Sequence, residues 1–184
     1  MTYETIILDI SGHIATITLN RPDAMNSFTK RMMDECAHAW RHIAETDDIH
    51  CAVLRAAPGR AFSTGVDVKA AMQPGGSVMH DNIWTAEDPG EKLGPKSNRC
   101  WKPVICAVHG MAAGGAFYWI NEADIVICSE DATFFDPHVT YGMTAALEPI
   151  GATYRMPLGD VLRMALLGND ERISAMTALR LGLV

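Results

Sequence analysis

The feature that most constrains this chain is a pair of adjacent glycines, Gly114 and Gly115, placed between an apolar run and a helical segment. Residues 103–108 are apolar and predict a buried strand, and residues 116–123 predict a helix. Glycines at such a junction let another group approach the backbone closely. They also leave the first N–H groups of the helix without intrahelical partners, at the positive end of the helix dipole. The segment therefore predicts a site for an anion or a developing oxyanion.

A second junction of the same kind lies upstream. Residues 51–56 predict a strand, and Gly65 follows where extended chain gives way to a helical turn, with Val66 at its start. Two separate amide donors on one carbonyl oxygen polarise a thioester and stabilise an enolate. We therefore predict that the main-chain N–H groups of Val66 and Gly115 hold one acyl oxygen, although either turn alone is a common structural element.

Taken together, the two turns and their flanking segments resemble the crotonase superfamily, also called the enoyl-CoA hydratase/isomerase family. Only the stretch from about residue 72 to 98, where the family itself varies, departs from the pattern. In family order the matching segments are LNRPDAMNS (19–27), RAFSTGVDVK (60–69), KPVICAVHG (102–110) with the glycine pair, ADI (123–125), DERISA (170–175) and LGLV (181–184).

The resemblance implies an α/β fold, a spiral of ββα turns with parallel sheets and flanking helices. It implies one domain over residues 1–184, with the spiral core at about 1–140 and the start of a helical region at about 141–184. Family members continue with further helices that close the site and mediate trimer contacts. We therefore expect the C-terminal helical region to be truncated here, and a homotrimer or a dimer of trimers as the assembly.

The residue pattern agrees with an alternating α/β order. Isoleucine- and threonine-rich runs at 5–8 and 14–19 predict a hairpin, and Ser27 or Thr29 is expected to cap a helix ending near Glu45. The helical spacing of Met32, Cys36, Trp40 and Ile43 predicts the buried face of that helix. Further segments complete the prediction, and Pro149 is expected to kink or split the first of the last three helices. These segments are strands at 51–56, 103–108 and 124–128, helices at 66–71 and 114–122, and C-terminal helices at 144–153, 158–167 and 173–181. The long loop after residue 71 is expected to cover the acyl group or to be a surface insertion, with Met72, Met79 and Trp84 as candidate lining.

Composition excludes several classes of protein. The chain has 184 residues, 48% of them apolar, which suits one domain with a substantial core, and its net charge of −7 argues against nucleic acid as a partner. No apolar run approaches the about 18 residues of a membrane span. The N-terminal residues lack a signal-peptide pattern, and the five cysteines are odd in number without CxxC spacing. We therefore expect a cytoplasmic protein with free thiols. No residue set has metal-ligand spacing, so we expect no metal and no cofactor except the coenzyme A of the substrate.

The resemblance assigns a coenzyme A site to five residues. Ala24 and Met25 are expected to meet the adenine end through their backbone. Arg60, Ser63 and Lys69 are expected to contact the rest of coenzyme A, the two basic residues near its phosphates. Taken without the resemblance, each basic residue is more simply a solvated surface charge.

Two glutamates of the family's hydratases are replaced in this sequence. The resemblance places Tyr118 and His138 at their positions. Tyrosine, with a reference pKa of about 10, is a poor base near neutrality, whereas histidine, at about 6.5, serves as acid or base. Glu148, ten residues after His138, is expected to orient it or to act as the base, and Asp136 is a weaker candidate. The predicted catalytic set is Val66, Gly115, Tyr118, His138 and Glu148.

These residues leave more than one function open. The first is an enzyme of the enoyl-CoA hydratase/isomerase type that stabilises a thioester enolate. Hydration follows by similarity, while isomerisation or C–C hydrolysis through His138 and Glu148 fits the chemistry at least as well. The second is a non-catalytic acyl-CoA-binding protein that kept the fold and lost its acids.

Overall fold

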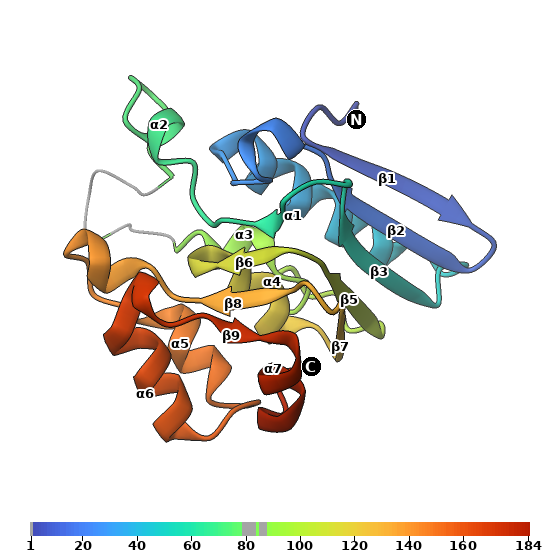
Figure 1. Cartoon of the computed structure of the whole chain (residues 1–184). Helices are drawn as coiled ribbons and strands as arrows, with labels where there is room; N and C mark the ends of the chain where they lie inside the picture. Colours follow the sequence, from blue (N-terminus) through green and yellow to red (C-terminus); the bar gives the residue numbers. More distant parts are fainter. Residues whose placement is uncertain (1, 79–83, 85–87) are drawn as a thin grey trace.

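The computed structural model describes residues 2–78, 84 and 88–184, and it contains two sheets (Figure 1). β1 pairs antiparallel with β2, and β9 pairs antiparallel with β8, whereas the other pairings are parallel. This confirms the predicted α/β class with parallel sheets. The first sheet has the order β1 (Ile6–Ser11), β2 (Ile14–Leu19), β3 (Cys51–Ala56), β5 (Val104–Val108) and β7 (Ile125–Cys128). The second has the order β4 (Ala61–Ser63), β6 (Met111–Ala113), β8 (Thr133–Phe135) and β9 (Ile173–Ser174).

The first sheet and its covering helix follow the sequence pattern. The predicted hairpin and the strand at 51–56 are present, and Ala15, Ile17 and Leu19, which share one face of β2, are fully buried. α1 (Lys30–Glu45) begins after Thr29, whose side chain accepts a hydrogen bond from the Met32 amide, so Thr29 rather than Ser27 is the cap. The predicted helical stripe is fully buried against the sheet, and its members are Met32, Cys36, Trp40 and Ile43.

The second sheet escapes sequence analysis because its strands are only two or three residues long. Each of its first three strands follows a strand of the first sheet, so the chain makes three successive ββ units. The passage from β5 to β6 needs Gly110, which has φ +57°, and a Cβ there would lie 2.4 Å from the Arg60 carbonyl oxygen. The predicted strand at 103–108 is present as β5, and the glycine pair lies between a strand and a helix as predicted; that strand is β6, which the sequence does not reveal.

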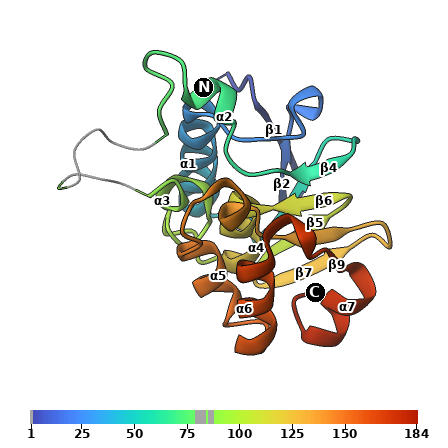
Figure 2. The ribbon, with the colours of Figure 1, turned by 60° about the vertical axis from the view of Figure 1, so that its left-hand side comes forward.

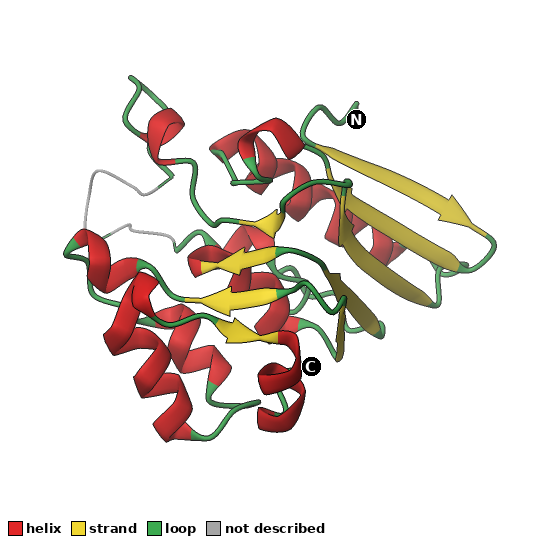
Figure 3. Cartoon of the chain, viewed as in Figure 1, coloured by secondary structure: helices red, strands yellow, loops and turns green. Residues whose placement is uncertain are grey.

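Short helical segments follow the strands of the second sheet. α2 (Val68–Ala71) comes after β4, η2 (Gly114–Ala116) and α4 (Phe117–Glu122) come after β6, and η3 (His138–Tyr141) comes after β8. The resulting repeat is the ββα spiral that the resemblance implies. Figure 3 shows the two groups of strands, with helices beside each.

The C-terminal helices α5 (Leu147–Ala152), α6 (Leu158–Leu167) and α7 (Ala175–Leu181) lie beside β8 and β9, away from the β1–β2 hairpin, in both Figure 1 and Figure 2. Pro149 does not split a helix. It is the third residue of α5, in the first turn, where its missing N–H has no intrahelical partner to lose. The helix predicted at 144–153 therefore begins later, at residue 147.

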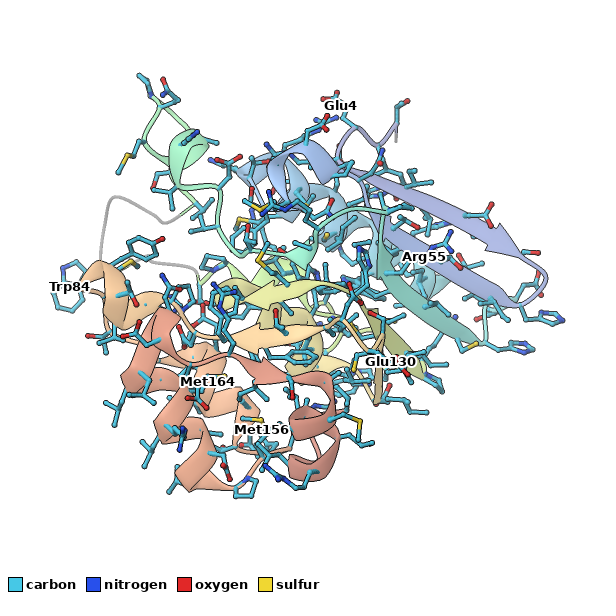
Figure 4. The ribbon with its side chains drawn as sticks, in the orientation of Figure 1. Glu4, Arg55, Trp84, Glu130, Met156 and Met164 are labelled. Carbon is cyan, nitrogen blue, oxygen red and sulfur yellow. The ribbon has the colours of Figure 1, made fainter. Side chains whose placement is uncertain are left out.

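The loop at 72–98 contains α3 (Gly90–Leu93), whose Leu93 is buried in the core. Two of the candidate lining residues point to solvent instead, because Met72 is 79% exposed and Trp84, at the outer edge of Figure 4, is 87% exposed. Met79 lies outside the described residues. Within the described residues, no helix is long and apolar enough to cross a membrane.

Candidate active site

The site lies at the carboxyl ends of β4, β6 and β8. In the second sheet Ser63 pairs with Ala112, and Ala113 pairs with Phe135, so the residues after the three strands share one edge. Those residues are the turn 64–66, the glycine pair 114–115 and the segment 136–138. Parallel pairing thus collects three segments that are far apart in the sequence.

The two glycine turns are in close contact. Gly65 has φ +80°, and a Cβ built on it would lie 2.9 Å from the Gly115 amide nitrogen and 3.1 Å from the Ala113 carbonyl oxygen. A Cβ on Gly115 would lie 2.5 Å from Cε1 of Phe28. Such distances leave no room for a side chain at either position. The structure therefore brings together the two turns that the sequence singled out.

The amides of Val66 and Gly115 are both left without a partner by the local fold. The Phe28 amide donates to the Gly65 carbonyl at 2.8 Å, and the Asp67 amide donates to the Phe28 carbonyl at 2.9 Å. A trans peptide places C=O and N–H on opposite sides, so the Val66 N–H points away from Phe28. No hydrogen bond between described residues uses it. Gly115 is the second residue of η2, where an N–H has no intrahelical acceptor.

An ion pair fastens the 20–28 loop to the turn that carries Val66. Arg21 Nη2 lies 2.8 Å from Asp67 Oδ2, and both side chains are largely buried. Asp67 also accepts from the Ala70 amide and so caps α2. Burial opposes ionisation of Asp67, but the hydrogen bonds from Ala70 and Arg21 hold the pKa of its carboxyl below the usual value.

The same loop places Ala24 and Met25 beside this turn. Met25 adopts φ +52°, and its carbonyl accepts from the Thr64 amide at 3.2 Å. Ser63 is fully buried, and its Oγ donates to the Asn26 carbonyl at 2.8 Å and accepts from the Gly65 amide. Its hydroxyl is therefore used inside the protein, where it holds the turn in place.

The two basic residues of the predicted coenzyme A site are not gathered with these groups. Arg60 precedes β4, whereas Val66 follows that strand, so the two lie at opposite ends of it. Lys69 is on α2, which stands away from the second sheet in Figure 1. Both residues are exposed.

On the other side of the glycine pair lies an imidazole held by carboxylates. The His138 Nδ1 atom is hydrogen-bonded to Oδ1 of Asp136, which is fully buried, and the His138 Nε2 atom lies 3.5 Å from Glu148 Oε1. A Cβ on Gly114 would lie 3.7 Å from Cε1 of His138, the ring carbon between the two nitrogens. The His138 ring therefore lies next to Gly114, the residue that precedes Gly115 and its open amide.

Both members of this pair have perturbed acidity. The hydrogen bond that the His138 ring donates to Asp136, helped by the charges of Asp136 and Glu148, raises the pKa of His138 against the effect of burial. Burial raises the pKa of Glu148, and the nearby carboxylates of Asp136 and Asp88 add to the shift while His138 opposes it. Burial and neighbouring charges thus shift the pKa of both groups, as is common at sites of proton transfer.

Tyr118 lies beyond Glu148, and its hydroxyl donates to Asp88 Oδ2 at 3.1 Å. Its ring packs on Gly90, where a Cβ would lie 2.6 Å from Cδ1. Burial, followed by the negative charges of Glu148 and Asp88, raises the pKa of Tyr118 far above its usual value. The phenol is therefore a hydrogen-bonding group and not a base. Sequence analysis missed Asp88, whose Asp-Pro-Gly context indicates only a turn.

Comparison with known proteins identifies the family of the chain. The sequence pattern of the enoyl-CoA hydratase/isomerase family matches residues 9–184, nearly the whole chain. The chain belongs to the enoyl-CoA hydratase/isomerase family. Among solved structures, an enoyl-CoA hydratase/isomerase from Mycobacterium paratuberculosis superposes with a TM-score of 0.88 at 39% identity, over 100% of this chain and 70% of that one.

Curated members of the family include both hydratases and isomerases. The (E)-benzylidenesuccinyl-CoA hydratase of Thauera aromatica is 33% identical over 97% of this chain and 68% of its own length. The 1,2-epoxyphenylacetyl-CoA isomerase of Escherichia coli is 30% identical over 91% of this chain and 64% of its own length. Family membership therefore indicates acyl-CoA chemistry without selecting one reaction.

Proposed function

We propose that this chain is an acyl-CoA enzyme that holds the thioester oxygen with the amides of Val66 and Gly115. His138 and Glu148 move the proton at the acyl carbons. The observation that carries the proposal is the contact between the turns, where a Cβ on Gly65 would lie 2.9 Å from the Gly115 nitrogen, with the His138 ring beside Gly114. Preorganised amides stabilise an enolate because they need not reorient as charge develops.

His138 and Glu148 form one cluster of proton-carrying groups, and a site with one such cluster favours double-bond isomerisation. With a 3-enoyl thioester, His138 Nε2 takes a proton from carbon 2, and the electron pair moves into an enolate whose oxygen the two amides hold. Return of a proton at carbon 4 moves the double bond from carbons 3 and 4 to carbons 2 and 3. Coenzyme A enters as part of the substrate, with the backbone of Ala24 and Met25 at its adenine end; Arg60 and Lys69, which the fold does not gather with these groups, are left out of the proposed site.

Hydration is the second candidate, because relatives such as the Thauera aromatica protein are hydratases by name. Water addition needs a base for water and an acid for the α-carbon, and His138 and Glu148 supply both at one place. Crotonyl-CoA, a 3-enoyl-CoA and a β-ketoacyl-CoA, offered to the purified protein, separate the reactions. We expect isomerisation of the 3-enoyl-CoA. Binding of all three without turnover of any would show a binding protein and end the enzymatic proposal.

The Asp136–His138 contact predicts a shift in the pH profile. Because Asp136 raises the pKa of His138, and the base must be neutral, activity should rise with pH through a midpoint above about 6.5. Asp136→Asn removes the charge, so this midpoint should move to lower pH while kcat falls, by roughly 100- to 10,000-fold, as the imidazole loses its orientation. The measurement is kcat against pH for both proteins.

The pH dependence of the stability of Asp136→Asn is an independent control, because the direction of its change with pH is fixed by the pKa shift of His138. A histidine with a raised folded-state pKa contributes stability that is fully present below the unfolded value of about 6.5 and is lost as pH rises through the folded value. Asp136→Asn should therefore lower the melting temperature more at pH 5.5 than at pH 8.5. A profile whose rising limb stays in place would show that Asp136 does not act on the base.

A further inference from the structure

A chain of polar contacts continues past the proposed proton carriers. From His138 it passes to Glu148, then to the hydroxyl of Tyr118, which the Glu148 carboxyl faces, and ends at Asp88. The segment that carries Asp88 grips the tyrosine from two sides. The Asp88 Oδ2 atom accepts the hydroxyl proton, and the Cα of Gly90 supports the ring, while Asp88 Oδ1 accepts from the Gly90 amide at 2.8 Å.

The direction of the hydrogen bonds in this chain follows from the number of protons available. A phenol hydroxyl has one proton to donate and lone pairs to accept with, while a carboxylate only accepts. Once Tyr118 donates to Asp88, its oxygen has no proton left for Glu148. The Tyr118 oxygen can then only accept, and the favourable partner for it is a protonated Glu148 carboxyl.

We propose that Asp88 is a positioning residue that acts through Tyr118. By accepting the phenol proton, it turns the Tyr118 oxygen into an acceptor for the Glu148 carboxyl proton. Glu148 is then held in its protonated form, and its proton is directed away from His138. The Nε2 lone pair of His138 stays free to act as the base. The catalytic meaning of this arrangement rests on the proposed function, but the arrangement itself is a property of the free protein.

The surroundings of Glu148 agree with a protonated carboxyl. It is 6% exposed, and three anionic or acceptor groups face it: Asp136 from the end of β8, Asp88 from the start of α3, and the Tyr118 oxygen from α4. A backbone hydrogen bond to its carboxylate and the charge of His138 favour the ionised form, but burial outweighs both. Burial among acceptors disfavours a second negative charge, which is why the pKa of Glu148 is raised.

The test is a titration of the Glu148 carboxyl carbon by NMR, assigned by the resonance lost in Glu148→Gln and followed without substrate. Tyr118→Phe should lower the midpoint, because it removes the acceptor that stabilises the protonated acid. Asp88→Asn should also lower it, because the phenol becomes free to donate to the Glu148 carboxylate. In the Asp88→Asn background, Tyr118→Phe should instead raise the midpoint, since it then removes a donor.

This reversal of sign separates positioning through Tyr118 from a direct effect of the Asp88 charge. Glu91→Gln is the matched control. Glu91 is on α3, just after Asp88 in the chain, and lines the same pocket of about 360 Å³ as Asp88 and Tyr118. Glu91→Gln therefore removes one nearby charge without changing a partner of the phenol, and the midpoint should hardly move. A rise of the midpoint in Tyr118→Phe alone, or the same sign in both backgrounds, would overturn the proposal. Because the titration needs no turnover, either result is distinct from inactivity on the thioester panel.

Discussion

Replacing Gly65 by alanine is expected to lower kcat/KM for the thioester reaction by roughly 100- to 1,000-fold, the usual cost of losing one oxyanion donor. The new Cβ would lie 2.9 Å from the Gly115 nitrogen, and φ at this position is +80°. Backbone atoms on both sides prevent a small side-chain movement from relieving the contact. The turns must separate, so the amides of Val66 and Gly115 can no longer meet on one oxygen.

Two other glycines separate this effect from general destabilisation. Gly12 has φ +57° but open space around its Cβ position, so Gly12→Ala reports the cost of the backbone conformation alone, about 1–2 kcal/mol. Gly159 is free of both constraints, and Gly159→Ala should leave stability and rate nearly unchanged. Melting temperature and kcat/KM are measured for all three. If Gly65→Ala loses stability like Gly12→Ala yet keeps its rate within a few-fold, the two turns do not share an oxygen.

The parts of the fold that the sequence predicts are the long ones. The stripe of Met32, Cys36, Trp40 and Ile43 extends over about three turns of helix, enough for its period to stand out, and the structure buries all four side chains. β3 is equally clear, as a segment of six residues that are apolar except for Arg55. The second sheet gave no such pattern, because a strand of three residues presents at most two side chains to one face.

The residues of the site fall into the same two groups, those that a local sequence pattern predicts and those that only the tertiary structure brings together. The sequence predicts Gly65 and Gly115 because a glycine between a strand and a helix has a local physical meaning. This prediction does not depend on the second sheet, which the sequence does not reveal. Their mutual contact, by contrast, depends on the parallel pairing of β4 with β6. Asp88 was not found, because it meets Tyr118 across 30 residues of chain and no local pattern marks a turn aspartate as the acceptor of a distant phenol.

His138→Ala should decide between the enzyme and the binding protein. If His138 carries the proton, kcat falls by roughly 100- to 10,000-fold, the usual contribution of a positioned acid or base. The Kd of an unreactive acyl-CoA should change little, since the proposed thioester contacts are main-chain amides. His138→Gln, which keeps a side-chain hydrogen-bonding group near the buried carboxylate of Asp136, guards against loss of the fold. His13→Ala, at an exposed turn of the hairpin, is the matched histidine control.

Combining His138→Ala with Glu148→Gln sharpens the result. Two residues that serve one proton-transfer reaction act as a unit, so the double variant should be hardly slower than the slower single variant. Independent roles would instead multiply the two losses. A binding protein gives a third outcome, in which no variant shows turnover and at most the affinity for acyl-CoA changes. Nε2 of His138 and Oε1 of Glu148 lie 3.5 Å apart, so both groups can act on the same acyl group, as the first outcome requires.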